Sequence, residues 1–326
     1  MIASLTLLVT VLMVSPIRPI LNHECHDIDR EYMMSWTAEN YHILLSPLSA
    51  PCHSSEHNKS KVLVIIPGTG FQDDREKIVL NNLKIIRKST PCVEIKCVLY
   101  AYKTPLSHIE DEIKRTCEVH TYFHVNYAHY LKSVLPSLVF QAKFTHVLLL
   151  LDDAQLPHGY RLQGLVDIMS CNELSVVSPT VVGAIYASTS CPFCCPRLRS
   201  TKSRSSPPLS SSPGHRAKVV EMFATLFTTE AWHCWWELLQ PGLNSIGWAY
   251  DKFLHTHCST VIPGFQMGII DSSVVLHTSD RIDYKLPYSN KSSMPWHDRD
   301  LWMAAAGWTT EREADVEHFG DPLVWP

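Results

Sequence analysis

One hydrophobic run constrains the fold of this chain more than any other feature. Residues 145–151 read THVLLLL, the most apolar strand candidate in the sequence, and the run ends abruptly at Asp152 and Asp153. A strand this hydrophobic must be covered on both faces, so it belongs in the middle of a mainly parallel sheet. The sequence therefore favours an α/β fold, with helices packed on the two faces of a central sheet.

Strand and helix patterns alternate around this run. Residues 61–66 (KVLVII) predict a buried strand that breaks at the tight loop Pro67-Gly68-Thr69-Gly70, and a helix follows from Asp73 or Asp74 to about Arg87. The order β, α, β, α is typical of a parallel sheet. We also expect strands at 93–102, 175–182 and 268–276, a mostly helical stretch at 108–138, and a Trp-rich helix from about 229 to 239 that Thr228 or Thr229 caps.

The composition is that of an ordinary globular protein, long enough for one large core or two small ones. Of the 326 residues 45% are hydrophobic and 18% are charged, which excludes disorder and coiled coil for the bulk of the chain. There are 28 Lys and Arg residues against 32 Asp and Glu, with no long basic stripe to follow a phosphate backbone. We therefore expect no nucleic-acid partner.

The N-terminus and the cysteines indicate the secretory pathway. Residues 1–17 (MIASLTLLVTVLMVSPI) carry no charged side chain and precede Arg18, which is typical of a signal peptide or a short signal anchor; a buried first element of the fold is the alternative. The 11 cysteines and the sequons at Asn58 and Asn290 favour an oxidising compartment. A Golgi membrane with a lumenal domain, or secretion, are the two destinations that we expect.

Changes in composition divide the chain further. Residues 18–60 are predicted to be a stem or loose lead-in, 61–280 the catalytic-type domain, and 281–326 a C-terminal extension. A Ser- and Pro-rich stretch at about 187–216 predicts a mobile insertion. Its CxxCC spacing could bind zinc, but no second pair accompanies it, so a disulfide or incidental thiols are favoured for Cys191, Cys194 and Cys195.

The two acids at the end of the central strand are the first candidates for chemistry. Ligands of open α/β sheets collect at the carboxyl ends of the strands, where Asp152 and Asp153 are expected. Adjacent carboxylates repel each other, and a divalent metal relieves that repulsion and can bridge to a phosphate. The alternative is that the pair only caps the next turn. His277, at the end of the last predicted strand, would complete a mixed site that favours manganese over magnesium.

Further candidates lie in the C-terminal half. Asp251 is expected near the start of a helix, either as an N-terminal charge on that helix or as a general base toward a hydroxyl group. Three tryptophans at helical spacing are interpreted as core or interface anchors, with sugar stacking as the alternative: Trp232, Trp235 and Trp236.

The sequence becomes specific over residues 219–278. The segments VVEMFATLFTTEAWHCWWELLQ, IGWAYDKFL and MGIIDSSVVLHT resemble the family called domain of unknown function 707. Members of that family typically show VEIMAPVFSRxAWxCxW, a GWGLD segment and a strand reading IGVVDSxxxxH. The segments THVLLLLDDAQL and KVLVIIPG extend the resemblance to roughly residues 61–280.

That family is similar to glycosyltransferases of the GT-A fold, a Rossmann-like α/β sandwich in which an Asp-x-Asp motif holds a divalent metal against the diphosphate of a nucleotide sugar. By this likeness Asp152 matches the first acid, Asp153 the middle position, and Ala154 stands where the second acid is expected. The resemblance implies that His277 is a further metal ligand and that Asp251 is a catalytic base or contacts the acceptor. The loop from Pro67 to Gly70 would face the nucleotide.

The resemblance therefore implies a glycosyltransferase. The expected reaction moves a sugar from a nucleotide-sugar donor to an acceptor hydroxyl, with help from a divalent metal that is manganese rather than magnesium. The departure at Ala154 keeps a second reading open, a secreted or anchored binding protein that retains the fold without turnover. A third reading is an interaction protein that binds through its Trp-rich helix.

Overall fold

The structure is a computed structural model that describes residues 60–69, 73–89, 93–101, 110–121, 127–133, 144–182, 213–244, 250–277 and 302–306. The predicted signal segment, the stem, both sequons and the CxxCC cysteines lie outside these residues. Within the described part, no helix is long and apolar enough to cross a membrane.

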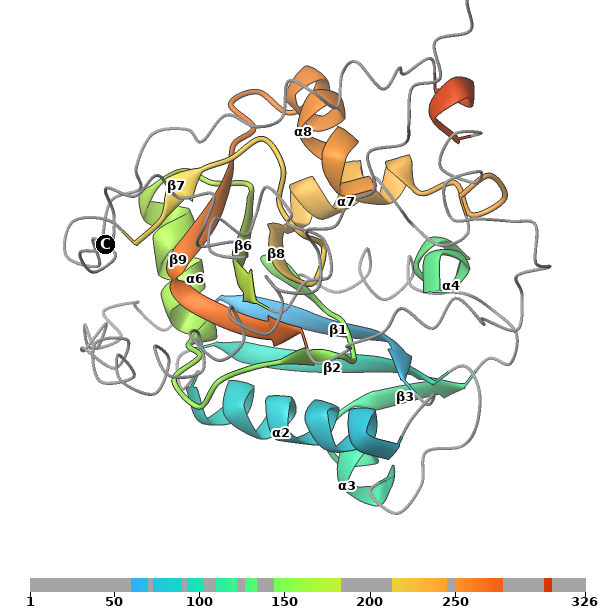
Figure 1. Cartoon of the computed structure of the whole chain (residues 1–326), viewed down its shortest axis with the longest axis vertical. Helices are drawn as coiled ribbons and strands as arrows, with labels where there is room; N and C mark the ends of the chain where they lie inside the picture. The colour runs from blue at the N-terminus through green and yellow to red at the C-terminus, as the bar shows by residue number, and fades with distance from the viewer. Residues whose placement is uncertain are drawn as a thin grey trace, which may run out of the picture.

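One sheet of nine strands forms the middle layer of the described structure (Figure 1). Its order is β3-β2-β1-β4-β8-β6-β9-β5, and β7 also pairs with β9. β8 runs antiparallel to β4 and β6, and β5 and β7 run antiparallel to β9, so the other strands share one direction. The strands are β1 (Lys61–Thr69), β2 (Glu94–Ala101), β3 (Glu118–Thr121), β4 (His146–Leu150), β5 (Ala154–Gln155), β6 (Val176–Val182), β7 (His215–Arg216), β8 (Ala224–Thr228) and β9 (Met267–His277).

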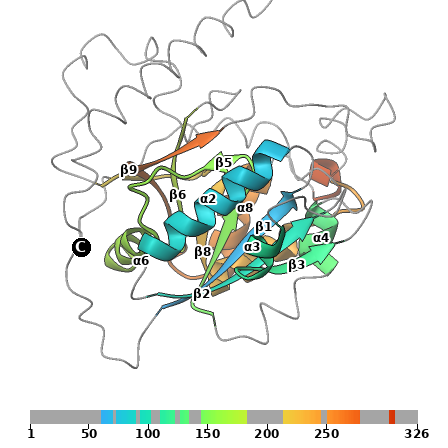
Figure 2. The same cartoon turned by 90° about the horizontal axis from the view of Figure 1, so that it is seen from below.

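Helices cover both faces of this sheet. One face carries α2 (Asp73–Ser89), α3 (Glu110–Lys114) and α6 (Leu162–Cys171), and α2 and α6 lie side by side on it (Figure 2). The opposite face carries α4 (Tyr127–Ser133), α7 (Thr229–Leu238) and α8 (Tyr250–Val261). The predicted α/β sandwich with a mainly parallel sheet is confirmed, and β4 lies in the middle of it.

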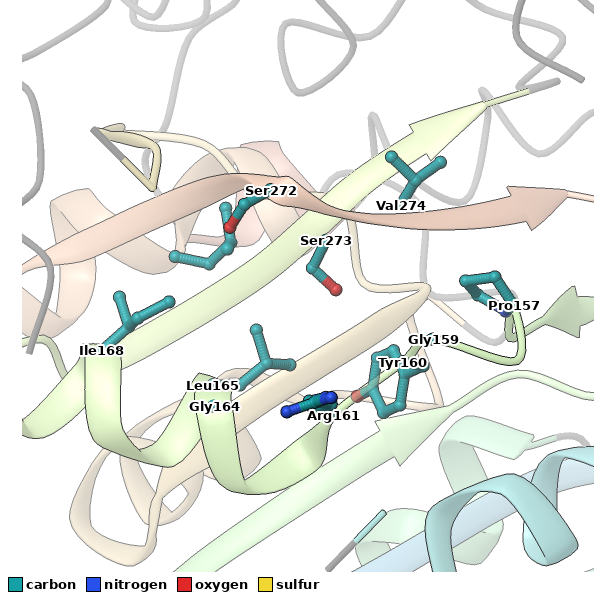
Figure 3. A pocket seen from close by; sticks show the side chains of 11 residues that line it. Pro157, Gly159, Tyr160, Arg161, Gly164, Leu165, Ile168, Ser272, Ser273 and Val274 are labelled. Carbon is teal, nitrogen blue, oxygen red and sulfur yellow. The ribbon is translucent and has the colours of Figure 1, made fainter. Parts of the chain in front are cut away.

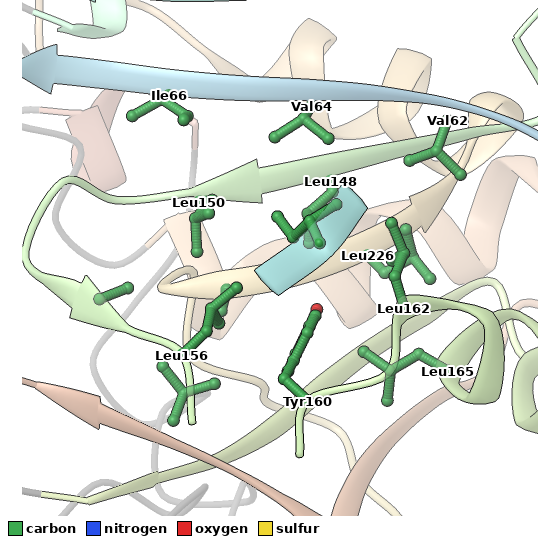
Figure 4. Close-up of a cluster of buried hydrophobic side chains, with 14 of the residues drawn as sticks. Val62, Val64, Ile66, Leu148, Leu150, Leu156, Tyr160, Leu162, Leu165 and Leu226 are labelled. Carbon is green, nitrogen blue, oxygen red and sulfur yellow. The ribbon is translucent and has the colours of Figure 1, made fainter. Parts of the chain in front are cut away.

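Alternation along the strands divides the core between the two faces. Val62, Val64 and Ile66 of β1 point to the α2 side, together with Leu148 and Leu150 of β4 (Figure 4). The intervening side chains of both strands point to the α7 side. Full burial of a Leu or Ile side chain contributes about 1.5 to 3 kcal/mol, so these strands are stabilised by both helical layers. The apolar run at 145–151 therefore needed two covering layers.

The prediction that the first strand breaks at Pro67 is wrong. β1 continues to Thr69, which pairs with Ala101 of β2, and the register shifts between Ile66 and Thr69. Proline has no N–H to donate to a neighbouring strand, so it is tolerated where the ladder is irregular. Gly70 lies outside the described residues.

The prediction of a mostly helical stretch over 108–138 is also wrong in its middle. α3 and α4 are present, but the edge strand β3 lies between them and pairs in parallel with β2. A disulfide between Cys97 and Cys117, with Cα atoms 4.5 Å apart, attaches the start of β3 to β2. The strand itself reads EVHT and is partly exposed, so no apolar pattern in the sequence indicated it.

The end of the predicted insertion belongs to the sheet. His215 and Arg216 form β7, which pairs with Ile269 and Gly268 of β9. Gly214 precedes β7 in a place where a Cβ atom would lie 2.0 Å from the carbonyl oxygen of Ile269, so only glycine fits. β7 therefore lies within the last residues of the segment predicted as an insertion at about 187–216.

The Trp-rich helix packs into the core. Thr228 caps α7, with its Oγ1 accepting a hydrogen bond of 3.2 Å from the backbone N–H of Ala231. Trp232 and Trp235 are buried, with ring centroids 4.9 Å apart. Trp302, from the predicted C-terminal extension, packs against Tyr250 of α8 in the same core. For Trp232 and Trp235 the core interpretation is therefore confirmed.

Candidate functional site

The acids at the end of β4 occupy a tight turn. Asp152 and Asp153 are its two middle residues, and the backbone N–H of Ala154 closes it with a bond of 3.1 Å to the carbonyl oxygen of Leu151. The chain then enters β5, where Ala154 pairs with His277 of β9. This antiparallel pairing brings the end of the last strand back to the turn at the carboxyl end of the central strand.

His277 therefore lies against the turn, as the sequence analysis expected. Its Nε2 is 3.3 Å from Oδ2 of Asp153, and the two side chains are 15% and 14% exposed. The imidazole ring also meets the ring of Phe223 edge to face, with centroids 4.6 Å apart. The structure thus brings together three predicted site residues, Asp152, Asp153 and His277. Their roles stay predictions.

A fourth residue at this place was missed. Arg75, in the first turn of α2, places Nη1 2.9 Å from Oδ1 of Asp152 and Nη2 3.5 Å from Oδ2 of Asp153. β1 and β4 are parallel neighbours, so the helix that follows β1 begins beside the turn that follows β4. The sequence places Arg75 just inside the helix after the first strand, but only the tertiary structure shows that β1 lies beside β4.

Burial and charge set the two carboxylates apart. Asp152 is 4% exposed, and burial raises its pKa to about 7, although the charge of Arg75 opposes the rise. Burial alone would also raise the pKa of Asp153, but the hydrogen bond and charge of His277, with the charge of Arg75, lower it below its ordinary value. Oδ2 of Asp152 is buried and has no hydrogen-bond partner among the described residues.

The side chain of Ala154, directly after the two acids, points into the core and not toward them. Ala154 is fully buried, and its side chain belongs to the apolar cluster under α2 and α6. Asn82, seven residues after Arg75 on the same face of α2, donates from Nδ2 to the carbonyl oxygen of Ala154. Its Oδ1 accepts a bond of 2.9 Å from the backbone N–H of Leu156. A carboxylate at position 154 would therefore enter the core.

The predicted manganese site does not fit the residues that the structure describes. Asp152, Asp153 and His277 offer the oxygen and imidazole donors that manganese accepts, but the guanidinium of Arg75 lies against both carboxylates. Within the described ranges, no three His, Cys, Asp or Glu side chains are arranged to hold a metal ion. Among the described residues, Arg75 is the cation that contacts both acids.

Asp251 lies in a second acidic pair. It is the second residue of α8, near a helix start as predicted, and α8 covers the face opposite to α2. Burial and, after it, the nearby charge of Glu221 raise the pKa of Asp251 to about 7. Glu221 precedes β8, and its carbonyl oxygen accepts a bond of 3.1 Å from Ser178 of β6. Sequence analysis did not identify Glu221, because no local motif marks it.

A small pocket of about 40 Å³ opens between α6 and β9 (Figure 3). It is lined by residues of the loop that follows β5, including Tyr160 and Arg161, and by Ser272 and Ser273 of β9. The hydroxyl of Tyr160 is buried, with no hydrogen-bond partner in the described structure.

The predicted nucleotide loop is only partly described. Pro67 is buried, and the backbone of Gly68 and Thr69 belongs to β1, whose carboxyl end lies next to that of β4. The segment is therefore at the same sheet edge as Asp152. Its contact with a nucleotide stays a prediction.

Comparison with known proteins confirms the family resemblance over part of the chain. A family described as a protein of unknown function, DUF707, matches residues 196–301. This range contains α7, α8 and β9 with His277. No curated protein matches the chain in sequence.

Solved structures with a similar fold include glycosyltransferases of the GT-A type. A structure of GalNAc-T7 with UDP, GalNAc and Mn²⁺ is 14% identical with a TM-score of 0.44, over 68% of this chain and 44% of that one. TarS of S. aureus is 11% identical with a TM-score of 0.39, over 68% of this chain and 37% of that one. This chain spans less than half of either protein. TarS residues 1–349 with UDP-GlcNAc are 10% identical with a TM-score of 0.38, over 75% of this chain and 71% of that one.

Proposed function

We propose that this chain is a glycosyltransferase that binds a nucleotide sugar beside the turn at Asp152 and transfers the sugar to an acceptor hydroxyl. One observation carries the proposal. Side chains from α2, from the turn after β4 and from the end of β9 converge there, and one buried carboxylate oxygen among them has no partner within the described residues. Such a convergence at the carboxyl edge of an α/β sheet marks a ligand site.

The proposed reaction is a group transfer. The bond from C1 of the sugar to the phosphate oxygen breaks, its electron pair leaves with the nucleoside diphosphate, and C1 bonds to the acceptor oxygen. The proton of the acceptor hydroxyl passes to the carboxylate of Asp251. A general base works best with a pKa near the working pH, and the pKa of Asp251 is raised to about 7.

The leaving diphosphate needs positive charge, and Arg75 supplies it at the turn. His277 holds Asp153 in place through Oδ2. No step is assigned to a divalent metal, because the residues present do not fit one.

The proposed setting is the lumen of the secretory pathway, with the N-terminal segment as a signal or anchor. Disulfides between Cys97 and Cys117 and between Cys234 and Cys258 support an oxidising compartment. Nucleotide-sugar donors and hydroxyl acceptors are the partners that this setting would provide.

Thermal unfolding with candidate ligands tests the donor site. A ligand that binds only the folded state at 100 times its Kd stabilises it by about 2.7 kcal/mol. We expect UDP, GDP or UDP-GlcNAc to raise the Tm of the wild type, and Asp152→Asn and His277→Ala to abolish that rise. Asp167→Asn on α6 is the matched control, because this half-buried carboxyl lies outside the turn and bonds to Gln163. No shift of the wild type with any of these ligands would reject the proposal.

The burial of Ala154 favours a second candidate, a binding protein that keeps the fold without turnover. The second acid of the Asp-x-Asp motif is missing, and Ala154, which stands in its place, is buried in the apolar core. Measuring release of nucleoside diphosphate from nucleotide sugars, with and without mixed sugar acceptors, separates the two. Binding without any release would favour this candidate over the transferase.

A further inference from the structure

The two acids of the turn already share a cation. Arg75 places one nitrogen on each carboxylate, at 2.9 Å from Asp152 and 3.5 Å from Asp153. Oδ2 of Asp153 is held between two groups, because Nε2 of His277 lies 3.3 Å away on another strand. Three separate elements thus fix one guanidinium at the carboxyl edge of β4.

Burial and hydrogen bonds fix the position of Arg75 relative to the two acids. Asp152 is 4% exposed, so its charge could not be tolerated there without a partner. Arg75 is 20% exposed, which leaves part of its side chain at the surface while both acids are largely covered. Asn82 of the same helix bonds to the backbone on both sides of Gln155 and fixes α2 relative to the turn. The position of Arg75 is therefore determined by the same helix that clamps β5.

The turn lacks one of the acidic ligands that an Asp-x-Asp motif offers to a metal ion. In an Asp-x-Asp arrangement a second acid two positions after the first would complete the ligands, but position 154 is an alanine whose side chain is in the core. An arginine is permanently charged, and its planar set of N–H donors matches both carboxylates and phosphates. It can therefore do what a bound divalent ion would do between these acids and an anionic ligand.

We propose that Arg75 takes the place of a divalent metal at this site, so that the donor diphosphate binds to a guanidinium held by Asp152 and Asp153. The diphosphate part rests on the proposed function, whereas the replacement of the metal by Arg75 can be tested by itself. The site then works without added metal, because its cation is part of the chain.

Manganese titration of the folded protein tests the replacement directly. We expect Mn²⁺ at millimolar concentration to leave the Tm of the wild type unchanged. In Arg75→Gln the two carboxylates lose their cation, and Mn²⁺ should then raise the Tm by several degrees. Arg87→Gln is the matched control, since it makes the same change on the exposed C-terminal end of α2. A rise for the wild type as large as that for Arg75→Gln would overturn the proposal.

Calorimetry with UDP as the probe tests the diphosphate. For the wild type, we expect the Kd in EDTA and in Mn²⁺ to agree within about twofold. A hydrogen bond to a charged group contributes about 1.5 to 3 kcal/mol, so Arg75→Gln should weaken binding by roughly 10- to 100-fold. Arg75→Lys keeps the charge and should bind UDP more tightly than Arg75→Gln.

The outcomes separate the two proposals. UDP binding by the wild type that requires Mn²⁺ would overturn the role of Arg75 and leave the proposed function standing. Failure of UDP and GDP to bind under any condition would contradict the proposed function, while the manganese titration would still decide whether Arg75 replaces the metal. If Arg75→Gln does not fold, the wild-type measurements in EDTA and Mn²⁺ decide by themselves.

Discussion

Two acidic pairs lie within the described residues, and they differ in the charges around them. At the turn, Asp152 and Asp153 share the guanidinium of Arg75; burial still raises the pKa of Asp152 to about 7, whereas His277 and Arg75 lower the pKa of Asp153 in spite of burial. At α8, burial and the charge of Glu221 both raise the pKa of Asp251 to about 7.

The difference indicates how neighbouring charges act on each pair. At the turn, the charge of Arg75 opposes the effect of burial on Asp152 and, with His277, lowers the pKa of Asp153. At α8, burial and the charge of Glu221 act in the same direction and favour the protonated form of Asp251.

Removing the shared cation should have the largest effect, because it makes the first pair resemble the second. In Arg75→Ala we expect a loss of about 3 to 5 kcal/mol in the free energy of unfolding at pH 8, because the buried carboxylate of Asp152 loses its ion pair and Asp153 loses the contact with Arg75. The loss should shrink at pH 5, where protonation relieves the repulsion. Urea unfolding at both pH values measures it, with Arg87→Ala as the control. Equal stability of Arg75→Ala and wild type at pH 8 would contradict the ion pair.

Adding a third carboxylate to the first pair tests the closed position. Ala154→Asp should destabilise the protein by about 3 kcal/mol, because the new side chain enters an apolar cluster without a partner. The same variant should gain no affinity for Mn²⁺. Unfolding in urea and manganese titration check the two parts, and a variant that is stable and binds Mn²⁺ tightly would show that position 154 faces the site.

The backbone clamp beside the first pair should matter less. In Asn82→Ala the carbonyl oxygen of Ala154 and the N–H of Leu156 lose their buried partners, which should cost about 2 kcal/mol. We expect UDP affinity to fall as well, since Arg75 lies on the same helix. Urea unfolding and calorimetry report the two effects. Asn82→Ala with unchanged stability would mean that the clamp is not needed to hold the turn.

Neutralising Asp251 should have the opposite sign. The folded protein binds a proton at Asp251 up to about pH 7, whereas the unfolded chain releases it near the ordinary value of 3.8, so Asp251 lowers stability as the pH rises through this range. Asp251→Asn should therefore be more stable than the wild type at pH 8 and equal to it near pH 4. Urea unfolding across this pH range measures it, with Asp111→Asn, at an exposed carboxyl of α3, as the control. Lower stability of Asp251→Asn at pH 8 would refute the raised pKa.

Strong local patterns predicted most of the fold. The apolar run that ends at Asp152 predicted the central strand, and Thr228 predicted the start of α7. Both features depend on a few adjacent residues, so they can be recognised in the sequence. β3 was missed because its residues are half exposed and a disulfide to Cys97 helps to hold it in place.

The candidate site was predictable only in part. Sequence patterns indicated Asp152, Asp153 and His277 and suggested that they meet. They did not indicate Arg75 or Asn82, which act from a helix some seventy residues earlier in the chain. They also did not show that Ala154 faces the core, because a register shift of one residue reverses the face on which a strand side chain lies.

The sequence by itself determined the layered α/β architecture and the acids at its central edge, since hydrophobic periodicity and strand ends are local properties of the chain. The tertiary structure alone decided which cation those acids hold and which carboxyl groups gain a raised pKa. Both depend on burial and on charges that approach across distant segments, and these distances are set only when the sheet and its helices have packed.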